Sequence, residues 1–380
     1  MNARKTTGNF AGSNSEKCIE KLFRIVTHSK ITKKMKKLLK VILLMGLFAC
    51  EEKNTTKAAE SIAEAKYLDI NGTKQFVMIR GKNDRNPVLL HLHGGPGVSE
   101  LGGLRKYNKD LEKDFVVVYW DQRNAGKSYV ENFPKAEIKV SKYIEDVNVL
   151  AKYLKNRLNV KKLFLVGHSW GSRLGMYAVQ KYPEHFSAFV GTGQEVAAAD
   201  GELQSYQYTM AKAKEFKIDS LVQQLEFIGE PKGGDFRTMY AFPDAFSLQK
   251  YILLELNRKI YDGFTIEKLY ANFQESDEYT AKEKETYLTG ANFANEHIVN
   301  DADYNNFDLR KQVSEVKIPV FFIAGKFDYV NPTPLAKQYF DLLKAPQKEF
   351  ILYDKSGHDP AWEEAQRFNA ELVRIYKAVK

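Results

Sequence analysis

Short, uninterrupted apolar segments recur along most of this chain. They are Val88–Leu92, Phe115–Trp120, Leu163–Val166, Ala188–Val190, Val320–Ile323 and Phe350–Leu352. Apolar runs of this length, without polar alternation, are typical of strands that are buried on both faces of a sheet. The pattern therefore predicts a strand at each of these positions.

Helical periodicity occupies several of the intervals between these strands. The clearest pattern spaces its apolar residues three or four positions apart: Ile144, Val147, Leu150, Leu154 and Leu158. Alternation of strands and helices predicts an α/β fold, with a mostly parallel central sheet flanked by helices. Ahead of it, Tyr67–Ile70 and Gln75–Ile79 flank Asn71-Gly72, a turn sequence that predicts an antiparallel hairpin.

The alternation breaks between residues 196 and 307. This interval is rich in aromatic residues and helical in pattern, so we predict that it forms a helical cap inserted into the sheet domain. The core would then comprise residues 66–195 and 308–380.

The net charge of +9 is confined to the start of the chain. Residues 1–50 hold 11 Lys and Arg against 2 Asp and Glu, whereas the remaining residues hold 46 of each. A body without net charge has no general attraction for a phosphate backbone, so we exclude nucleic acid as a partner. No cysteine follows Cys50, which excludes disulfides, a thiol nucleophile and cysteine metal sites there. We expect neither a metal nor a cofactor.

The segment Met35–Cys50 has a basic start, an apolar stretch too short to span a bilayer, and Leu-Phe-Ala before Cys50. This order resembles a bacterial lipoprotein signal peptide. The resemblance implies that residues 35–49 are removed and that the Cys50 thiol is lipidated. The protein is then expected in the cell envelope, held to a membrane on its periplasmic or surface side. We interpret residues 1–34 as an upstream extension outside the native chain, and residues 50–65 as a tether.

The sequence Gly167-His168-Ser169-Trp170-Gly171 lies between a predicted strand and a predicted helix. In that setting, G-x-S-x-G is typical of a serine nucleophile on a sharp turn, where the glycines let neighbouring chains come close. A serine hydroxyl needs a base to take its proton. We select His358, because it lies in the loop after the last predicted strand, at the carboxyl edge of the sheet. The remaining histidines of the body fit positioning or packing roles: His91, His93, His168, His185 and His297.

An acid that orients the imidazole is also required. Asp328 lies in the loop after the strand at Val320–Ile323 and is our candidate, whereas Asp341 and Asp354 fit solvated positions. The developing oxyanion needs hydrogen-bond donors. We expect the backbone N–H of Trp170 and that of Gly95, which lies in a glycine-rich loop after an early strand.

The motifs His93–Gly97, Trp120–Arg123 and Gly167–Gly171, with Asp328 and His358, together resemble the proline iminopeptidase family of α/β-hydrolases. The resemblance covers about residues 67–197 and 313–380. It implies an α/β-hydrolase fold and a Ser-His-Asp triad that releases an N-terminal residue, preferentially proline, through an acyl-enzyme.

The family further implies that cap glutamates and the His-Gly-Gly-Pro-Gly region hold the substrate amine. The candidate glutamates here are Glu195, Glu226 and Glu255. The chain departs from the family in having Asn124 after Asp-Gln-Arg, where a glycine is usual, and Gly191–Glu195 in place of a Leu-Arg-Gly sequence.

The leading interpretation is a serine aminopeptidase that acts on peptides with proline or another small residue at the N-terminus. The alternative is a carboxylic-ester or amide hydrolase that uses the same triad on a small acyl substrate. A non-catalytic, ligand-sensing protein on this scaffold is a third. Dehalogenase and epoxide hydrolase chemistry is disfavoured, because those relatives carry an aspartate where this chain has Ser169.

We predict that Cys50→Ser abolishes membrane association of the native protein, because it removes the thiol that would carry the lipid. Several acyl chains give stable anchoring where one alone is marginal. The measurement is fractionation of cells into membrane and soluble material, with mass spectrometry of the N-terminus. An intact, unmodified Met35–Cys50 segment in the native protein would contradict the prediction.

Overall fold

The computed structural model describes residues 59–242, 244–261, 263 and 265–380. The predicted extension, the signal segment and Cys50 lie outside these residues. The first strand begins at Ile62, so the folded part starts ahead of the predicted core boundary at residue 66. None of the helices within the described ranges has the length and hydrophobicity needed to cross a bilayer.

In the described part of the chain, eight strands form one sheet, in the order β1-β2-β4-β3-β5-β6-β7-β8. The strands are β1 (Ile62–Ile70), β2 (Thr73–Gly81), β3 (Val88–Leu92), β4 (Val116–Trp120), β5 (Leu163–His168), β6 (Phe186–Thr192), β7 (Val320–Gly325) and β8 (Lys348–Tyr353). The predicted hairpin is confirmed, since β1 and β2 pair antiparallel across Asn71-Gly72. From β4 to β8 all pairings are parallel.

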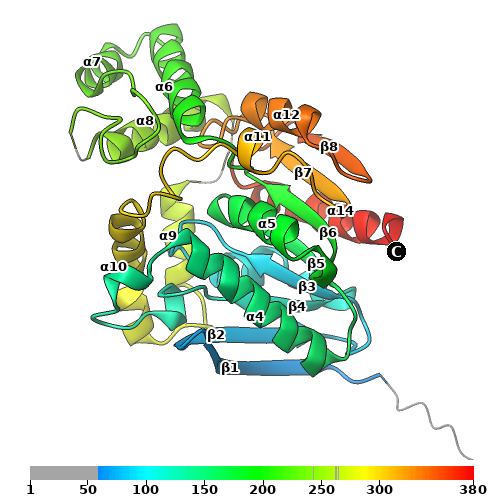
Figure 1. Cartoon of the computed structure of the whole chain (residues 1–380). Coiled ribbons are helices and arrows are strands. Elements are labelled where there is room, and N and C mark those ends of the chain that lie inside the picture. The colour runs from blue at the N-terminus through cyan, green and yellow to red at the C-terminus, as the bar shows by residue number, and fades with distance from the viewer. Residues whose placement is uncertain (1–58, 243, 262, 264) are drawn as a thin grey trace, which may run out of the picture. The chain divides into compact units, whose positions relative to one another are not determined.

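Helices cover both faces of this sheet, as predicted (Figure 1). The helices outside the cap are α3 (Leu101–Tyr107), α4 (Val140–Leu158), α5 (Trp170–Lys181), α11 (Leu309–Gln312), α12 (Thr333–Leu342), α13 (Pro360–Glu363) and α14 (Ala365–Ala378). Leu90 of β3 belongs to a buried cluster with α4, α5 and α12, whereas Leu89 belongs to a second cluster with α3 and α14. Successive residues of the strand thus face opposite helical layers, which explains its continuous apolar sequence.

The strand β8 departs from the prediction of burial on both faces. It lies at the edge of the sheet, and most of its residues are partly or fully exposed.

Between β6 and β7 the chain forms helices that interrupt the α/β alternation. They are α6 (Ala198–Glu215), α7 (Asp219–Ile228), α8 (Ala245–Ile260), α9 (Ile266–Gln274) and α10 (Ala281–Ile298). The helices α6, α7 and α8 share a small apolar cluster of their own, which includes Tyr206, Leu225 and Ile252. We call the five helices from α6 to α10 together the cap.

Ion pairs join the second half of the cap to the core. Arg105 Nε lies 2.8 Å from Glu278 Oε1, and Lys106 Nζ lies 3.0 Å from Glu275 Oε2. On another core loop, Lys127 Nζ lies 2.6 Å from Glu283 Oε2. Three core cations therefore hold the segment from α9 to α10 in place.

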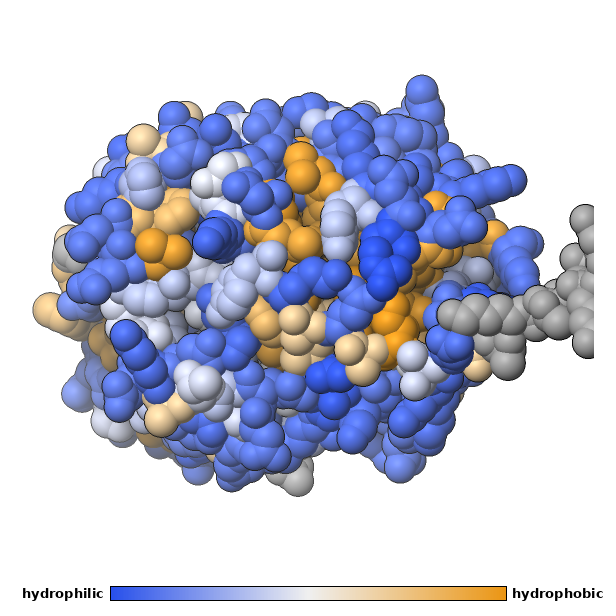
Figure 2. Space-filling model, turned by 90° about the horizontal axis from the view of Figure 1, so that it is seen from below, coloured by the Kyte–Doolittle hydropathy of each residue, from blue (hydrophilic) through white to orange (hydrophobic). Residues whose placement is uncertain are grey.

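Large apolar side chains are exposed on several cap helices. Phe227 of α7 is 74% exposed, and Tyr251, Tyr270 and Leu288 are also exposed. On the face shown in Figure 2, hydrophilic residues surround a central group of apolar ones.

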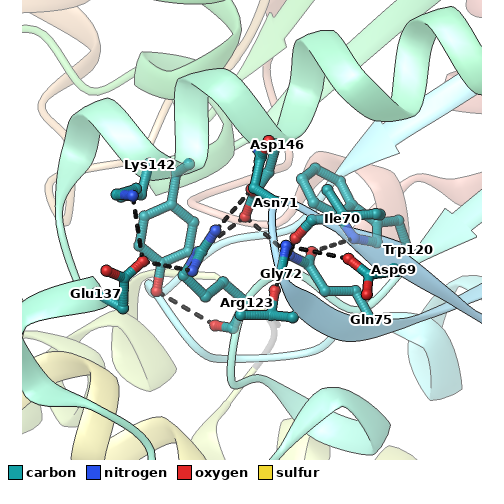
Figure 3. A network of polar contacts seen from close by, with 12 residues as sticks. Asp69, Ile70, Asn71, Gly72, Gln75, Trp120, Arg123, Glu137, Lys142 and Asp146 are labelled. Atoms are coloured by element: carbon teal, nitrogen blue, oxygen red, sulfur yellow. Dashed lines mark hydrogen bonds and ion pairs between the residues drawn. The ribbon is translucent and has the colours of Figure 1, made fainter.

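A buried polar network fixes the loop after β4 (Figure 3). The guanidinium of Arg123 donates two hydrogen bonds to Asp146 of α4, at 2.9 and 2.7 Å. Asn71 and Gln75 of the hairpin also donate to the Asp146 carboxylate, at 2.7 and 2.8 Å. The hairpin, the β4 loop and α4 are thereby joined through one fully buried carboxylate.

Asn124, which follows Arg123, adopts a φ of 57°. Asparagine tolerates this left-handed conformation, so the turn forms without the glycine that is usual in the resembled family.

Candidate active site

Ser169 lies on a sharp turn between β5 and α5, in the strand–turn–helix setting that the sequence predicts. Its φ of 53° and ψ of −122° are rare for a non-glycine residue. A Cβ at Gly167 would overlap the carbonyl of Gly171, and one at Gly171 would overlap the carbonyl of Leu92. The flanking glycines therefore permit the close approach of chains that this turn needs.

The structure brings His358 and Asp328 into contact. His358 Nδ1 donates to Asp328 Oδ2 at 3.0 Å, and Asp328 Oδ1 accepts the backbone N–H of Asn331 at 3.0 Å. Burial would lower the pKa of His358, but the Asp328 carboxylate outweighs burial and raises it above its ordinary value. Gly193, at φ 53°, leaves room for the ring, since a Cβ there would lie 2.9 Å from His358 Cε1.

Behind Ser169, Glu100 and His168 form a buried ion pair. Glu100 Oε1 accepts from His168 Nδ1 at 2.6 Å and from the backbone N–H of Gly94 at 2.9 Å. Burial would lower the pKa of His168, but the charge of Glu100 raises it to about 10. Conversely, burial would raise the pKa of Glu100, but His168 lowers it to about 2. His168 is thus charged at neutral pH, and its Nε2 donates to the backbone carbonyl of His358 at 2.9 Å.

The glycine-rich loop after β3 is held beside Ser169 by its own histidine. His93 Nε2 accepts the backbone N–H of Gln122 at 3.0 Å, and Gln122 in turn donates to the carbonyl of His93 at 2.9 Å. The indole of Trp170 donates to Gln122 Oε1 at 3.0 Å. Since the N–H of Gly94 is committed to Glu100, Gly95 is the next donor that this loop can offer.

A cavity of about 170 Å³ opens onto Ser169 and His358. Residues of both the core and the cap line it. Its lining comprises Gly94, Gly95, Val98, Glu100, His168, Ser169, Leu254, Thr265, Leu269, Val330, His358, Asp359 and Trp362. The surface is mainly apolar, with two carboxylates. Across the described residues, no group of three or more His, Cys, Asp or Glu side chains is arranged to hold a metal ion.

The family model of the alpha/beta hydrolase fold matches residues 87–365. The chain belongs to the α/β-hydrolase family. The "Probable aminopeptidase YbaC" of Bacillus subtilis (strain 168) is 34% identical to this hydrolase over 319 residues, which cover 83% of this chain and 96% of that protein. The proline iminopeptidase of Heyndrickxia coagulans is 22% identical over 308 residues, which cover 80% of this chain and 96% of that protein.

Among solved structures, the proline iminopeptidase of Mycobacterium smegmatis is similar in fold. It gives a TM-score of 0.59 at 14% identity and covers 83% of this chain and 98% of its own. The predicted α/β-hydrolase fold is confirmed.

The structure does not bring the three predicted amine-binding glutamates to the cavity of this hydrolase. Glu195 Oε2 lies 3.2 Å from Nε of the buried Arg173. Glu226 is exposed on α7, and Glu255 pairs with Arg258 of its own helix at 3.2 Å. None of the three lines the cavity, and each side chain faces another partner or is exposed.

The carboxylates that do line the cavity are Glu100 and Asp359, which are not among the residues predicted from the sequence. Both follow predicted motifs: Glu100 lies just beyond the glycine-rich loop, and Asp359 directly follows His358. Their adjacency to those motifs was the available signal. Apart from this adjacency, the sequence does not distinguish such an acidic residue from one that is exposed to solvent.

We predict that Glu100→Gln lowers the free energy of unfolding of this hydrolase by about 3–5 kcal/mol near pH 6, because it breaks a buried ion pair. The pair makes its full contribution to the free energy of unfolding between pH 4.5 and pH 6.5. These limits are the ordinary pKa values of Glu100 and of His168. Its contribution is lost as the pH rises through about 10, where His168 deprotonates. The loss in the variant should therefore shrink from pH 6 to pH 9.5, as measured by denaturant unfolding.

The matched control is Glu349→Gln, which breaks an exposed pair with Arg374. Exposed ion pairs contribute only about 0–1 kcal/mol to the free energy of unfolding. An equally small effect of Glu100→Gln, or one that does not depend on pH, would contradict the prediction.

Proposed function

We propose that this α/β hydrolase is a serine aminopeptidase that releases a small N-terminal residue, proline or another, from peptides. The observation that carries the proposal is the convergence of Ser169, on its strained turn, with the His358–Asp328 pair at one small cavity. The names of the relatives, aminopeptidase and proline iminopeptidase, support the substrate class.

In the proposed reaction, Ser169 Oγ attacks the carbonyl carbon of the first residue while His358 Nε2 takes the hydroxyl proton. The contact between Nδ1 and Asp328 places a proton on Nδ1 and leaves Nε2 able to accept. The backbone N–H groups of Gly95 and Trp170 would stabilise the oxyanion. His358 then returns the proton to the leaving amine, and water hydrolyses the acyl-enzyme.

The cavity suits a small apolar first residue. Its volume is about 170 Å³, and Leu254, Leu269, Val98 and Trp362 present apolar surface to it. Such surface favours a proline ring or a small aliphatic side chain through the hydrophobic effect.

The same apolar lining also favours a second candidate, a carboxylic-ester or amide hydrolase for small acyl groups. The two candidates share every step at Ser169. They differ in whether the substrate must carry a free amine.

We predict that Ser169→Ala abolishes turnover of proline and alanine p-nitroanilides and of p-nitrophenyl acetate, while the fold is retained. Loss of a triad nucleophile costs about 10⁶-fold in kcat. Labelling by a fluorophosphonate probe should disappear as well, and circular dichroism should be unchanged. Persistent labelling of the variant would place the nucleophile elsewhere. Wild-type activity on the ester alone would favour the second candidate.

We predict that Asp328→Asn lowers kcat by about 10⁴-fold, because the imidazole then adopts the wrong tautomer. The carboxylate also raises the pKa of His358, and His358 must be neutral to accept a proton. In the wild type, kcat/KM for a neutral ester should therefore fall as the pH drops through a value above 6.5. In the variant, this acid limb should move to lower pH. An unshifted limb would show that another group titrates.

A further inference from the structure

The cavity beside Ser169 contains two carboxylates with different surroundings. Glu100 is almost fully buried, and its Oε1 accepts from Gly94 and His168. Its Oε2 lies 3.5 Å from His91 Nε2. Every oxygen of Glu100 therefore already faces a protein partner, and its charge is neutralised by His168. Glu100 is not available to a ligand.

The carboxylate of Asp359 differs from that of Glu100 in both its exposure and its hydrogen bonding. Its side chain is 17% exposed and faces the cavity, and its Oδ1 lies 3.7 Å from His168 Nε2, beyond hydrogen-bond distance. The Nε2 proton of His168 is already donated to the carbonyl of His358. Within the described ranges, the carboxylate of Asp359 has no hydrogen bond. Burial raises its pKa, and the charge of His168 at 3.7 Å opposes this rise without cancelling it.

A structural role does not account for this carboxylate. Asp359 is the N-cap residue of α13, where an aspartate commonly accepts backbone N–H groups. Its side chain makes no such bond. Its nearest cation, His168, lies beyond hydrogen-bond distance. A carboxylate that borders a mainly apolar cavity without a hydrogen bond carries an electrostatic cost that a cationic ligand would relieve.

We propose that Asp359 binds the α-ammonium group of the substrate. The proposal rests on the proposed function and adds to it the residue that selects unblocked N-termini. The α-amine is attached to the carbon next to the carbonyl that Ser169 attacks, so the ammonium must lie close to Ser169. A carboxylate adjacent in sequence to His358 and on the same small cavity is placed for that contact.

The charges of the cavity agree with this assignment. Glu100 and His168 neutralise each other, and His358 is neutral when it acts as a base. Among the residues that line the cavity, Asp359 is then the carboxylate without a neutralising hydrogen-bond partner, and an ammonium group would supply the opposite charge. The amine subsite thus lies on the core loop that carries His358, and the cap glutamates take no part.

The test compares a free-amine substrate with a neutral ester. Asp359→Asn should raise KM for alanine p-nitroanilide tenfold or more, since removing one partner of a desolvated charge pair is costly. It should change KM for p-nitrophenyl acetate less than twofold, because the triad is intact. Asp359→Glu should recover part of the loss. The matched control is Asp354→Asn, an exposed aspartate on the same loop, which should alter neither substrate.

A binding readout separates this proposal from the proposed function. Prolinamide should inhibit ester hydrolysis competitively in the wild type, and Asp359→Asn should raise its inhibition constant at least tenfold. This holds even if the wild type cleaves no aminoacyl substrate, an outcome that would refute only the proposed function.

Three results would overturn the role of Asp359. The first is an equal effect of Asp359→Asn on amine and ester substrates, which a purely structural role predicts. The second is an amine-selective rise in KM in Glu226→Gln or Glu255→Gln instead. The third is an absence of inhibition by prolinamide in the wild type.

Discussion

The buried ion pair between Glu100 and His168 organises the loops that meet at Ser169. A neutral imidazole has one N–H, whereas a charged one has two. Because Glu100 keeps His168 charged, the ring donates both to Glu100 and to the carbonyl of His358. Glu100 also holds Gly94. One charge thereby ties together the loops after β3, β5 and β8, which are far apart in the sequence.

Much of this fold could be predicted from the sequence, because its main determinants are local. A strand buried on both faces must be continuously apolar, and Val88–Leu92 matches β3 residue for residue. The turn at Ser169 needs glycines on either side, and these are visible as a motif. The positions of His358 and Asp328 follow from a general property of parallel sheets, whose loops converge at one edge.

Partners of charged side chains were harder to predict, because they depend on tertiary packing. Glu195 follows a central strand, which suggested a position at the cavity, but the buried guanidinium of Arg173 holds it elsewhere. Arg123 ends the Trp120–Arg123 motif on which the predicted resemblance was based, and its side chain bonds to Asp146 in the interior. Nothing in the local sequence distinguishes Glu195 and Arg123, which pair with other side chains of the chain, from Asp359, which lines the cavity.

The core and the cap contribute different kinds of side chain to the cavity. The residues proposed for the chemistry and for the amine all come from core loops, whereas the cap contributes the uncharged Leu254, Thr265 and Leu269. Substitutions in the cap can therefore alter the shape of the first-residue pocket without disturbing the charges that drive the reaction. Under the proposed function, the preference for the first residue of the substrate would therefore be adjustable through the cap alone, while the core stays unchanged.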